Sequence, residues 1–419
     1  MVNSIIGSGI FGLPSAVAGL VGRFSPGAVL VAGAAIGVIM LCFAEVASRF
    51  SQTGGPYLYA RTAFGRFTGI EMGWLFWLSQ LASPAANANL FVIYLGEFWA
   101  HSKDPLPRFL ILTLLVAVLA FINYRGVRGG TGVSNIFTIA KLLPLAVVVV
   151  TGLFYIHASH ATPPPAMALP GGAAWLKAIF LLFFAYGGFE SALAPMGEAK
   201  NPCRDVAFAL LVGLATCTLV YTLIQRVVIG VLPDPAHSER PLADAARLIM
   251  ARFTMGRSGA AFMAVGALIS TYGLLSAKIL AVPRITFALA EQRDFPSLFA
   301  AIHPRFRTPY LSVLAFAGLV WLLALFGSFS WNVTLTVFSR LFYFAVVCAA
   351  LPVLRKKHSG EAQFRLPAGN FFAGLGILIC LVLVTRVDFN GALIVIATIV
   401  AALLNWLWVR RRKSQILAH

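Results

Sequence analysis

Long stretches without a charged residue are the feature of this 419-residue sequence that most restricts its fold. The hydrocarbon core of a bilayer is about 30 Å thick, and a helix needs about 20 mainly apolar residues to cross it. Windows of that size recur along the chain, at residues 26–44, 72–96, 206–225, 258–277, 366–385 and 389–409. They lack the alternation of polar and apolar residues that is typical of membrane β-strands. The sequence therefore predicts an all-α protein that crosses a membrane many times.

The composition indicates the same class. Hydrophobic residues make up 59% of the chain and charged residues 11%, whereas about 25% of the residues of an average soluble domain are charged. A net charge of +18 would suggest nucleic-acid binding in a soluble protein. Here the basic residues collect on one side of the predicted helices, so we expect the lipid bilayer as the partner and no nucleic acid.

Twelve membrane helices account for the apolar segments. The predicted spans are 2–22, 26–51, 68–97, 107–126, 131–157, 173–199, 204–233, 257–290, 309–328, 330–355, 370–387 and 389–411. Segments 53–65 and 238–255 are predicted to form short helices between them. More than half of the 32 Lys and Arg residues fall on the side that holds both termini. Since cationic segments stay in the cytoplasm, we expect a multi-pass protein of the cell inner membrane with both termini cytoplasmic.

Two of the predicted helices contain a break. The first includes GSGIFGLP at residues 7–14, and the sixth includes FAYGGFE at residues 184–190. Glycine costs about 1 kcal/mol relative to alanine inside a helix, so paired glycines favour unwinding. Interrupted helices at corresponding positions of two halves indicate a transporter with its site between them. Small residues that only allow close helix packing are the alternative for either segment alone, and the five-helix offset favours the transporter.

Signals for an enzyme or a cofactor are weak. Residues 7–12 match the G-x-G-x-x-G pattern of dinucleotide-binding proteins, but that pattern requires a preceding strand and a βαβ unit. All seven histidines fall in loops or at helix ends of the predicted topology, and no HExxH motif or cysteine cluster occurs. We therefore expect no enzyme activity, no catalytic residues, no metal site and no cofactor.

Five short motifs follow one another along the chain: GSGIFGLP at 7–14, GGPY at 54–57, EAKNPCRD at 198–205, AVPR at 281–284 and HPRFRTP at 303–309. Together they resemble the bacterial amino acid permeases of the amino acid–polyamine–organocation superfamily. The resemblance implies a secondary active transporter with a five-plus-five inverted repeat, two discontinuous helices and two extra C-terminal helices. The repeats would cover residues 1–157 and 158–355, and the extra helices and a basic tail would cover 356–419.

The resemblance also implies a substrate site at the two breaks. The candidate substrate-binding residues are Ile5, Gly7, Ser8, Gly9, Phe184 and Gly187. Backbone N–H groups and the hydroxyl around Ser8 would hold the carboxylate of an amino acid, and free carbonyl groups of both breaks would hold its ammonium. Phe184 would lie over the substrate as an aromatic gate, and Gly187 would leave room for a larger substrate.

Lys141 and Glu190 are the candidate coupling residues. Lys141 lies about ten residues into the fifth helix, or roughly 15 Å deep, and ionisable groups inside a membrane are functional candidates by default. The resemblance implies that this lysine takes the place of a sodium ion and joins the first, fifth and eighth helices. A lysine that reaches back to the cytoplasmic interface is the alternative. Glu190 would sense protons or bond to freed backbone N–H groups.

Arg340 lies near mid-depth in the tenth helix, where it could pair with a carboxylate, contact an anionic substrate or hold a gate. Lys278 and Arg226 are interpreted as packing or interfacial charges. Because of Lys141 we expect transport without sodium, either coupled to protons or by exchange. A channel, a membrane protein without transport activity, and a carrier of a polyamine or other organic cation are the alternatives. The particular amino acid, the oligomeric state and a start upstream of Met1 stay open.

Overall fold

The computed structural model describes residues 5–50, 55–126, 131–159, 169–190, 202–252, 254–357, 362, 364–387 and 389–416. Within these ranges the regular structure is helical, without a strand. The fold class predicted from the apolar windows is therefore confirmed. The motif at 198–205 and the end of the predicted span 173–199 lie largely outside the described residues.

Among the described residues, one helix overlaps each of the twelve predicted spans. These helices are α2 (Gly9–Val21), α3 (Ser25–Ala47), α5 (Arg66–Leu95), α6 (Pro105–Arg125), α7 (Thr131–Ser159), α8 (Gly172–Tyr186), α10 (Pro202–Val231), α12 (Gly256–Glu291), α13 (Tyr310–Phe326), α14 (Phe329–Lys357), α15 (Gly369–Val384) and α16 (Phe389–Ile416). The short helices α4 (Gly55–Phe64) and α11 (Pro241–Ala251) also form where predicted. Three single turns are 3₁₀ helices: η1 (Gly22–Phe24), η2 (Ala100–Lys103) and η4 (Ser297–Ala300).

The apolar helices are of two lengths. Among the described residues, five segments are long and apolar enough to cross a membrane: Gly9–Ala47, Pro105–Arg125, Phe208–Val231, Gly256–Glu291 and Phe329–Lys357. Five shorter apolar helices are Lys141–His157, Gly172–Tyr186, Tyr310–Phe326, Gly369–Val384 and Gly391–Leu407. Helix α5 belongs to neither group. Its polar residues Gln80, Asn87 and Asn89 are buried inside the protein, so the protein rather than lipid surrounds them.

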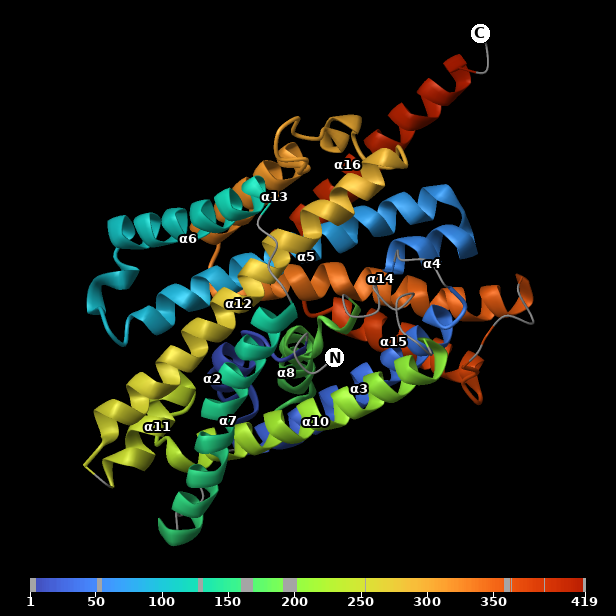
Figure 1. The fold of residues 1–419 in the computed structure, drawn as a ribbon. Coiled ribbons are helices and arrows are strands. Elements are labelled where there is room, and N and C mark those ends of the chain that lie inside the picture. Colours follow the sequence, from blue (N-terminus) through green and yellow to red (C-terminus); the bar gives the residue numbers. More distant parts are fainter. Residues whose placement is uncertain are drawn as a thin grey trace.

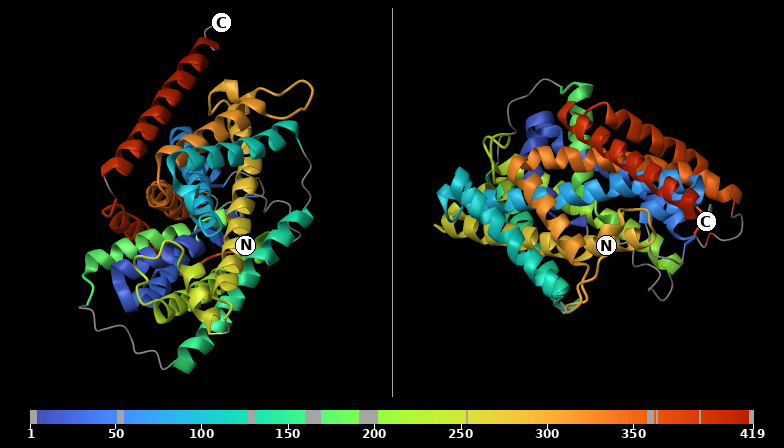
Figure 2. Two further views of the ribbon diagram at one scale, coloured as in Figure 1. Left: turned by 90° about the vertical axis from the view of Figure 1, so that its left-hand side faces the viewer. Right: turned by 90° about the horizontal axis from the view of Figure 1, so that it is seen from above.

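The helices pack around two central pairs (Figures 1 and 2). Helix α14 lies along α5 through the middle of the molecule, and α2 packs against α8. Helix α3 lies along α10 on the outside of the second pair. Large apolar side chains are exposed on the outer helices, among them Leu114, Phe154 and Phe208 at 67%, 72% and 69%. Such exposure suits a lipid environment, because water would disfavour it.

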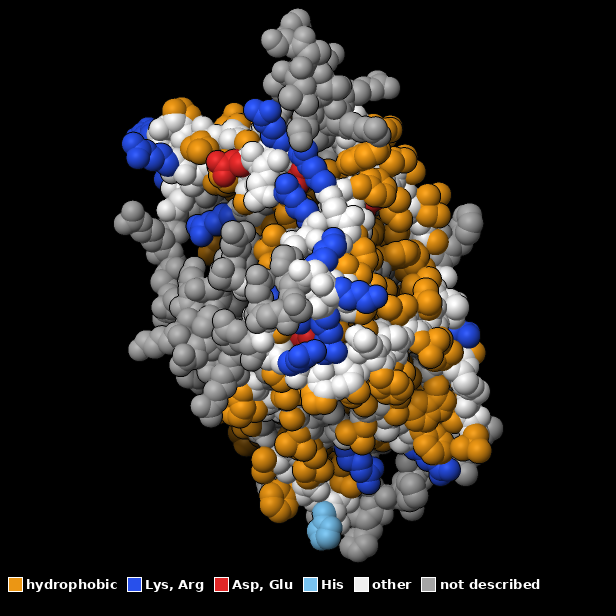
Figure 3. Space-filling model, turned by 90° about the vertical axis from the view of Figure 1, so that its right-hand side faces the viewer, with side chains coloured by type: hydrophobic (Ala, Val, Ile, Leu, Met, Phe, Trp, Pro, Cys, Tyr) orange, Lys and Arg blue, Asp and Glu red, His pale blue; other side chains and the backbone are white. Residues whose placement is uncertain are grey.

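One end of the molecule is rich in basic side chains. Figure 3 views the end where α4 and the C-terminal end of α14 lie, and Lys and Arg side chains form a band down that face beside a hydrophobic area. The last turn of α14 contributes Arg355, Lys356 and Lys357. This end therefore carries a band of basic side chains, and the predicted charge bias between the two sides and the orientation in the cell membrane stay predictions.

Two fully buried carboxylates tie this end together. Asp294 accepts hydrogen bonds from Arg61 at 2.9 Å, from Arg66 at 2.7 Å and from the Tyr57 hydroxyl. Burial and the neighbouring Asp294 carboxylate raise the pKa of Tyr57, so its hydroxyl stays protonated and donates. Glu45 makes a similar cluster with Arg355, at 2.6 Å. The GGPY motif thus joins α4 to the segment after α12.

We expect Asp294→Asn to destabilise the protein by about 1–3 kcal/mol, because Arg61 and Arg66 lose a charged acceptor. Both arginines are about a third exposed (37% and 33%), so water recovers part of the loss. Thermal unfolding of the purified protein in detergent measures the effect. Asp104→Asn is the control, since Asp104 pairs with exposed His101 and is itself 57% exposed. Equal unfolding midpoints for the two variants would contradict the role given to Asp294.

Candidate functional site

The first break lies just before α2. Ile5 is helical, residues 6–8 leave the helix, and α2 begins at Gly9. The carbonyl of Ser8 accepts hydrogen bonds from the amides of Phe11 and Gly12 at 3.1 and 3.0 Å. The Ser8 hydroxyl is buried and makes no hydrogen bond within the described residues. The first N–H groups of a helix lack intrahelical partners and carry partial positive charge, so this turn suits an anion.

The second break ends α8 at Tyr186. Gly187 and Gly188 form a turn, and Phe189 and Glu190 are helical again. Gly188 has a φ of 109°, a backbone conformation that glycine adopts without steric cost. The amide of Gly188 donates to the Glu190 carboxylate at 2.9 Å. Of the two roles suggested for Glu190, bonding to a freed N–H group is what the structure shows, and proton sensing stays a prediction.

The two breaks face each other through Gly9. A Cβ atom added at Gly9 would lie 2.6 Å from the Cα atom of Ala185, so only glycine allows this approach of α2 to α8. Gly9 also lines the cavity between the breaks. Close helix packing and a place in the cavity were alternatives for this segment. Both apply to Gly9.

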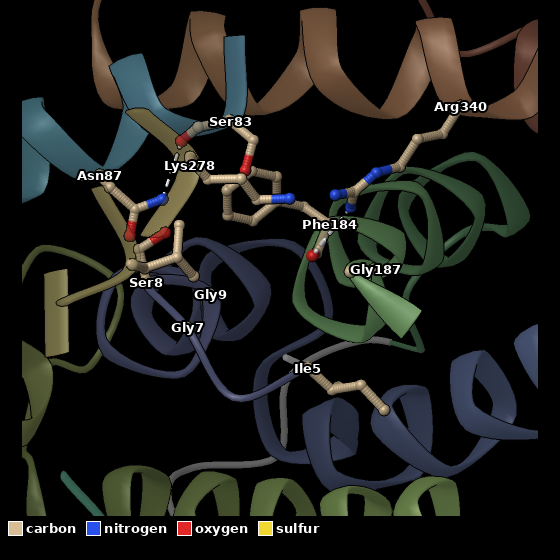
Figure 4. A pocket seen from close by; sticks show the side chains of 12 residues that line it. Ile5, Gly7, Ser8, Gly9, Ser83, Asn87, Phe184, Gly187, Lys278 and Arg340 are labelled. Atoms are coloured by element: carbon tan, nitrogen blue, oxygen red, sulfur yellow. Dashed lines mark hydrogen bonds between the residues drawn. The ribbon is translucent and has the colours of Figure 1, made fainter. Parts of the chain in front are cut away.

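The breaks enclose a cavity (Figure 4). Its lining residues are Ile5, Gly7, Ser8, Gly9, Ser83, Asn87, Phe184, Gly187, Gly188, Leu274, Lys278 and Arg340. The six candidate substrate-binding residues are all among them, so the structure brings together every residue that the resemblance assigned to the site. The centre of a water molecule can reach only about 20 Å³ of this space, which is enough for about one water molecule.

Side chains satisfy several of the carbonyl groups that the breaks release. The Tyr221 hydroxyl has one proton to donate, and two carbonyls lie within reach of it, those of Ala185 at 3.0 Å and Ile5 at 3.2 Å. Arg340 Nη1 donates to the carbonyl of Phe184 at 3.3 Å. Each carbonyl oxygen has two lone pairs. Ile5 and Phe184 can therefore still accept a hydrogen bond from a substrate ammonium, which is the role predicted for them.

Lys141 is buried, with 4% of its surface exposed. Its Nζ atom donates to the carbonyl of Ile6 at 2.6 Å. This bond joins α7 to the break before α2, as the resemblance implied, and it argues against a side chain that reaches back to the interface. The expected link to α12 and a part in coupling stay predictions.

Arg340 pairs with Glu190. Its Nε atom lies 3.3 Å from Glu190 Oε1, and the Tyr343 hydroxyl donates to the same oxygen at 3.0 Å. A Cβ atom at Gly187 would lie 1.6 Å from Arg340 Nη1. The space beside Gly187, which we expected to admit a larger substrate, is filled by the guanidinium group. Of the three roles left open for Arg340, pairing with a carboxylate is present in the structure.

Lys278 lies in the lining of the cavity, a place that its interpretation as a packing or interfacial charge did not include. Its Nζ atom donates to Gln80 Oε1 at 2.5 Å. Helix α12 runs from Gly256 to Glu291, close to the predicted span 257–290, so Lys278 lies well inside the helix.

Sequence reasoning also missed Ser83 and Asn87 of α5. The Asn87 amide donates to the carbonyl of Ser83 at 2.8 Å, and Asn87 Oδ1 has no partner within the described residues. The two residues are four apart and so share a helix face. Their signal was present as polar residues inside the apolar window 72–96.

A multi-pass helical protein with two facing helix breaks around a polar cavity has the architecture of a membrane carrier. The family model described as amino acid permease matches residues 1–408. The chain belongs to the amino acid permease family, as its motifs implied.

Relatives from bacteria and animals are also transporters. The chain is 28% identical to the serine/threonine exchanger SteT of Bacillus subtilis, over 90% of this chain and 86% of that protein. It is 27% identical to the methylthioribose transporter of the same species, over 87% and 81%. It is 29% identical to cationic amino acid transporter 4 of Mus musculus, over 84% and 58%. The family is one of transporters and not of enzymes, and the names of its members cover several substrates.

We expect Gly187→Ala to destabilise the protein by about 1–3 kcal/mol through overpacking, because the new Cβ atom must displace the Arg340 guanidinium. The midpoint of thermal unfolding in detergent measures this cost. Gly172→Ala, at the other end of α8, is the control, since a Cβ atom there meets nothing within 4 Å. If both variants unfold at the wild-type temperature, the position of Arg340 does not require the absence of a side chain at residue 187.

Proposed function

We propose that this protein carries amino acids across the cell inner membrane by alternating access, without sodium, and that the substrate binds in the cavity between α2 and α8. The observation that carries the proposal is that six residues chosen for their place in two helix breaks line one cavity. These breaks lie in the first helix of each predicted repeat, 1–157 and 158–355, which supports that division of the chain.

The chemistry of the cavity suits both ends of an amino acid. The unpaired hydroxyl of Ser8 and the N-terminal turn of α2 offer donors to the carboxylate. The carbonyls of Ile5 and Phe184 and the unpaired Asn87 Oδ1 offer acceptors to the ammonium. An amino acid needs more than the volume of one water molecule, so binding requires the helices around the breaks to move. This requirement favours a carrier over an open channel.

Lys141 supports transport without sodium. Its ammonium already bonds to a carbonyl released at the first break, where a coupling cation would otherwise neutralise backbone dipoles. The lysine can act as a fixed strut or as a proton-binding group. Uptake measured at several pH values separates these two modes, and exchange is tested by loading vesicles with unlabelled substrate.

Ser8→Ala should raise the KM for counterflow of a transported amino acid about tenfold, because one hydrogen bond to a charged group is lost. The hydroxyl has no partner in the protein, so the fold does not depend on it. Ser15→Ala is the matched control, since Ser15 lies in α2, the helix that begins directly after Ser8. Its hydroxyl is also buried and unpaired within the described residues, and it does not line the cavity. Equal KM values for wild type and Ser8→Ala would show that the substrate carboxylate does not bind at Ser8. Ohmic current instead of saturable counterflow would indicate a channel.

Lys141→Ala should reduce net transport about tenfold or more, because the Ile6 carbonyl loses a charged donor. Wild-type uptake should be unchanged when choline replaces sodium at constant pH. A proton-binding role predicts that the residual activity of the variant loses its pH dependence, and a strut predicts an unchanged profile. Lys177→Ala, at an exposed lysine of α8, is the control. Sodium-dependent wild-type uptake, or full activity of Lys141→Ala, would remove Lys141 from the mechanism.

A further inference from the structure

Among the described residues, the cavity is lined by two basic side chains and by no carboxylate. Lys278 reaches it from α12 and Arg340 from α14, and the other lining residues are apolar or neutral. Figure 4 shows the ammonium of Lys278 and the guanidinium of Arg340 pointing toward each other beside Phe184. The two charges are close enough to act on each other. Like charges that face each other in a site shielded from water repel, and the repulsion grows as the dielectric constant falls.

Glu190 is a single negative charge that acts on both basic groups. Its carboxylate pairs with Arg340 and also accepts hydrogen bonds from Gly188 and Tyr343. It lies behind Arg340 and is not part of the lining. The wall that a substrate would meet is therefore cationic. Among the described residues at this place, the two positive charges exceed the single negative charge of Glu190.

We infer that the transported substrate carries a net negative charge, as an amino acid with an acidic side chain does, and that its second carboxylate binds between Lys278 and Arg340. This inference rests on the proposed function and names the class of substrate for the same cavity. A second carboxylate between the two basic groups converts their repulsion into attraction. The first carboxylate stays at Ser8 and the turn that begins α2.

The same arrangement opposes cationic substrates. A polyamine, or an amino acid with a basic side chain, would bring a further positive charge against Lys278 and Arg340. A zwitterion with a neutral side chain would leave the excess charge of the wall uncompensated in the membrane, which is costly. The order of preference by charge is therefore acidic first, neutral second and basic last. The printed names of the relatives do not supply this order, since they include both a serine/threonine exchanger and a cationic amino acid transporter.

The test uses pairs of amino acids that differ in charge and hardly in shape. The purified full-length protein is reconstituted in proteoliposomes, and counterflow is measured with L-glutamate against L-glutamine and with L-aspartate against L-asparagine. L-Serine and L-arginine complete the panel. We expect at least one acid to be preferred over its amide about tenfold or more in apparent affinity. This wild-type comparison does not depend on the folding of any variant.

Variants of Lys278 test whether the cavity wall causes the preference for acidic substrates. Lys278→Gln should bring the ratio of acid to amide toward one, through weaker binding of the acid, and Lys278→Arg should keep most of the ratio. Lys177→Gln is the matched control, because it removes the same charge from an exposed position on α8, and it should leave the ratio unchanged.

Four results would overturn the inference. An amide bound as well as its acid, or an unchanged ratio in Lys278→Gln, would show that the wall does not select for negative charge. Transport of serine or arginine without either acid would leave the proposed function intact and refute this substrate class. If no amino acid of the panel shows counterflow, the proposed function fails and the inference fails with it.

Discussion

The fold around the cavity depends on how backbone groups are satisfied where two helices are interrupted. A membrane interior offers no water to an unpaired N–H or carbonyl group, so each break must find partners in the protein. Here the partners are side chains from other helices. The hydroxyl of Tyr221 in α10 lies within hydrogen-bond distance of the carbonyls of Ile5 and Ala185, one on either side of the contact between α2 and α8. Lys141 of α7 bonds to Ile6 in the same turn. The breaks thus bind four helices to one another.

Electrostatics in the second break depends on one buried pair. Arg340 and Glu190 are 2% and 1% exposed, and burying two charges is costly unless each is well bonded. Glu190 meets that condition through Gly188 and Tyr343. Arg340 meets it in part: Nη1 donates to the carbonyl of Phe184, and Nε pairs with Glu190 without a hydrogen bond within the described residues. The pair fixes the end of α8 against α14. It also explains why position 187 is glycine, since any side chain there would displace the guanidinium group.

The positions of the helices and of the breaks could be predicted from the sequence because their causes are local. Apolar windows set the spans, and Gly7, Gly9 and Gly187 mark the segments that unwind. The occupant of the space beside Gly187 could not be predicted, because Arg340 comes from a helix about 150 residues later. The place of Lys278 in the cavity lining could not be predicted either, because its neighbours there come from other helices, such as Gln80 of α5. Contacts between distant segments decided each of these cases.

For the cavity to open, the helices that carry the two breaks must move away from α5 and α14, to which the contacts described above now join them. Helix α14 lies along α5, and both supply polar residues to the wall opposite the breaks. The hydrogen bond from Arg340 of α14 to the carbonyl of Phe184 in α8, at 3.3 Å, joins this wall directly to the second break. A substrate carboxylate that binds Arg340 would compete for the same N–H groups. Substrate binding would then weaken the contact that keeps the cavity small, so the residue that recognises the anion would also permit the movement that transport requires.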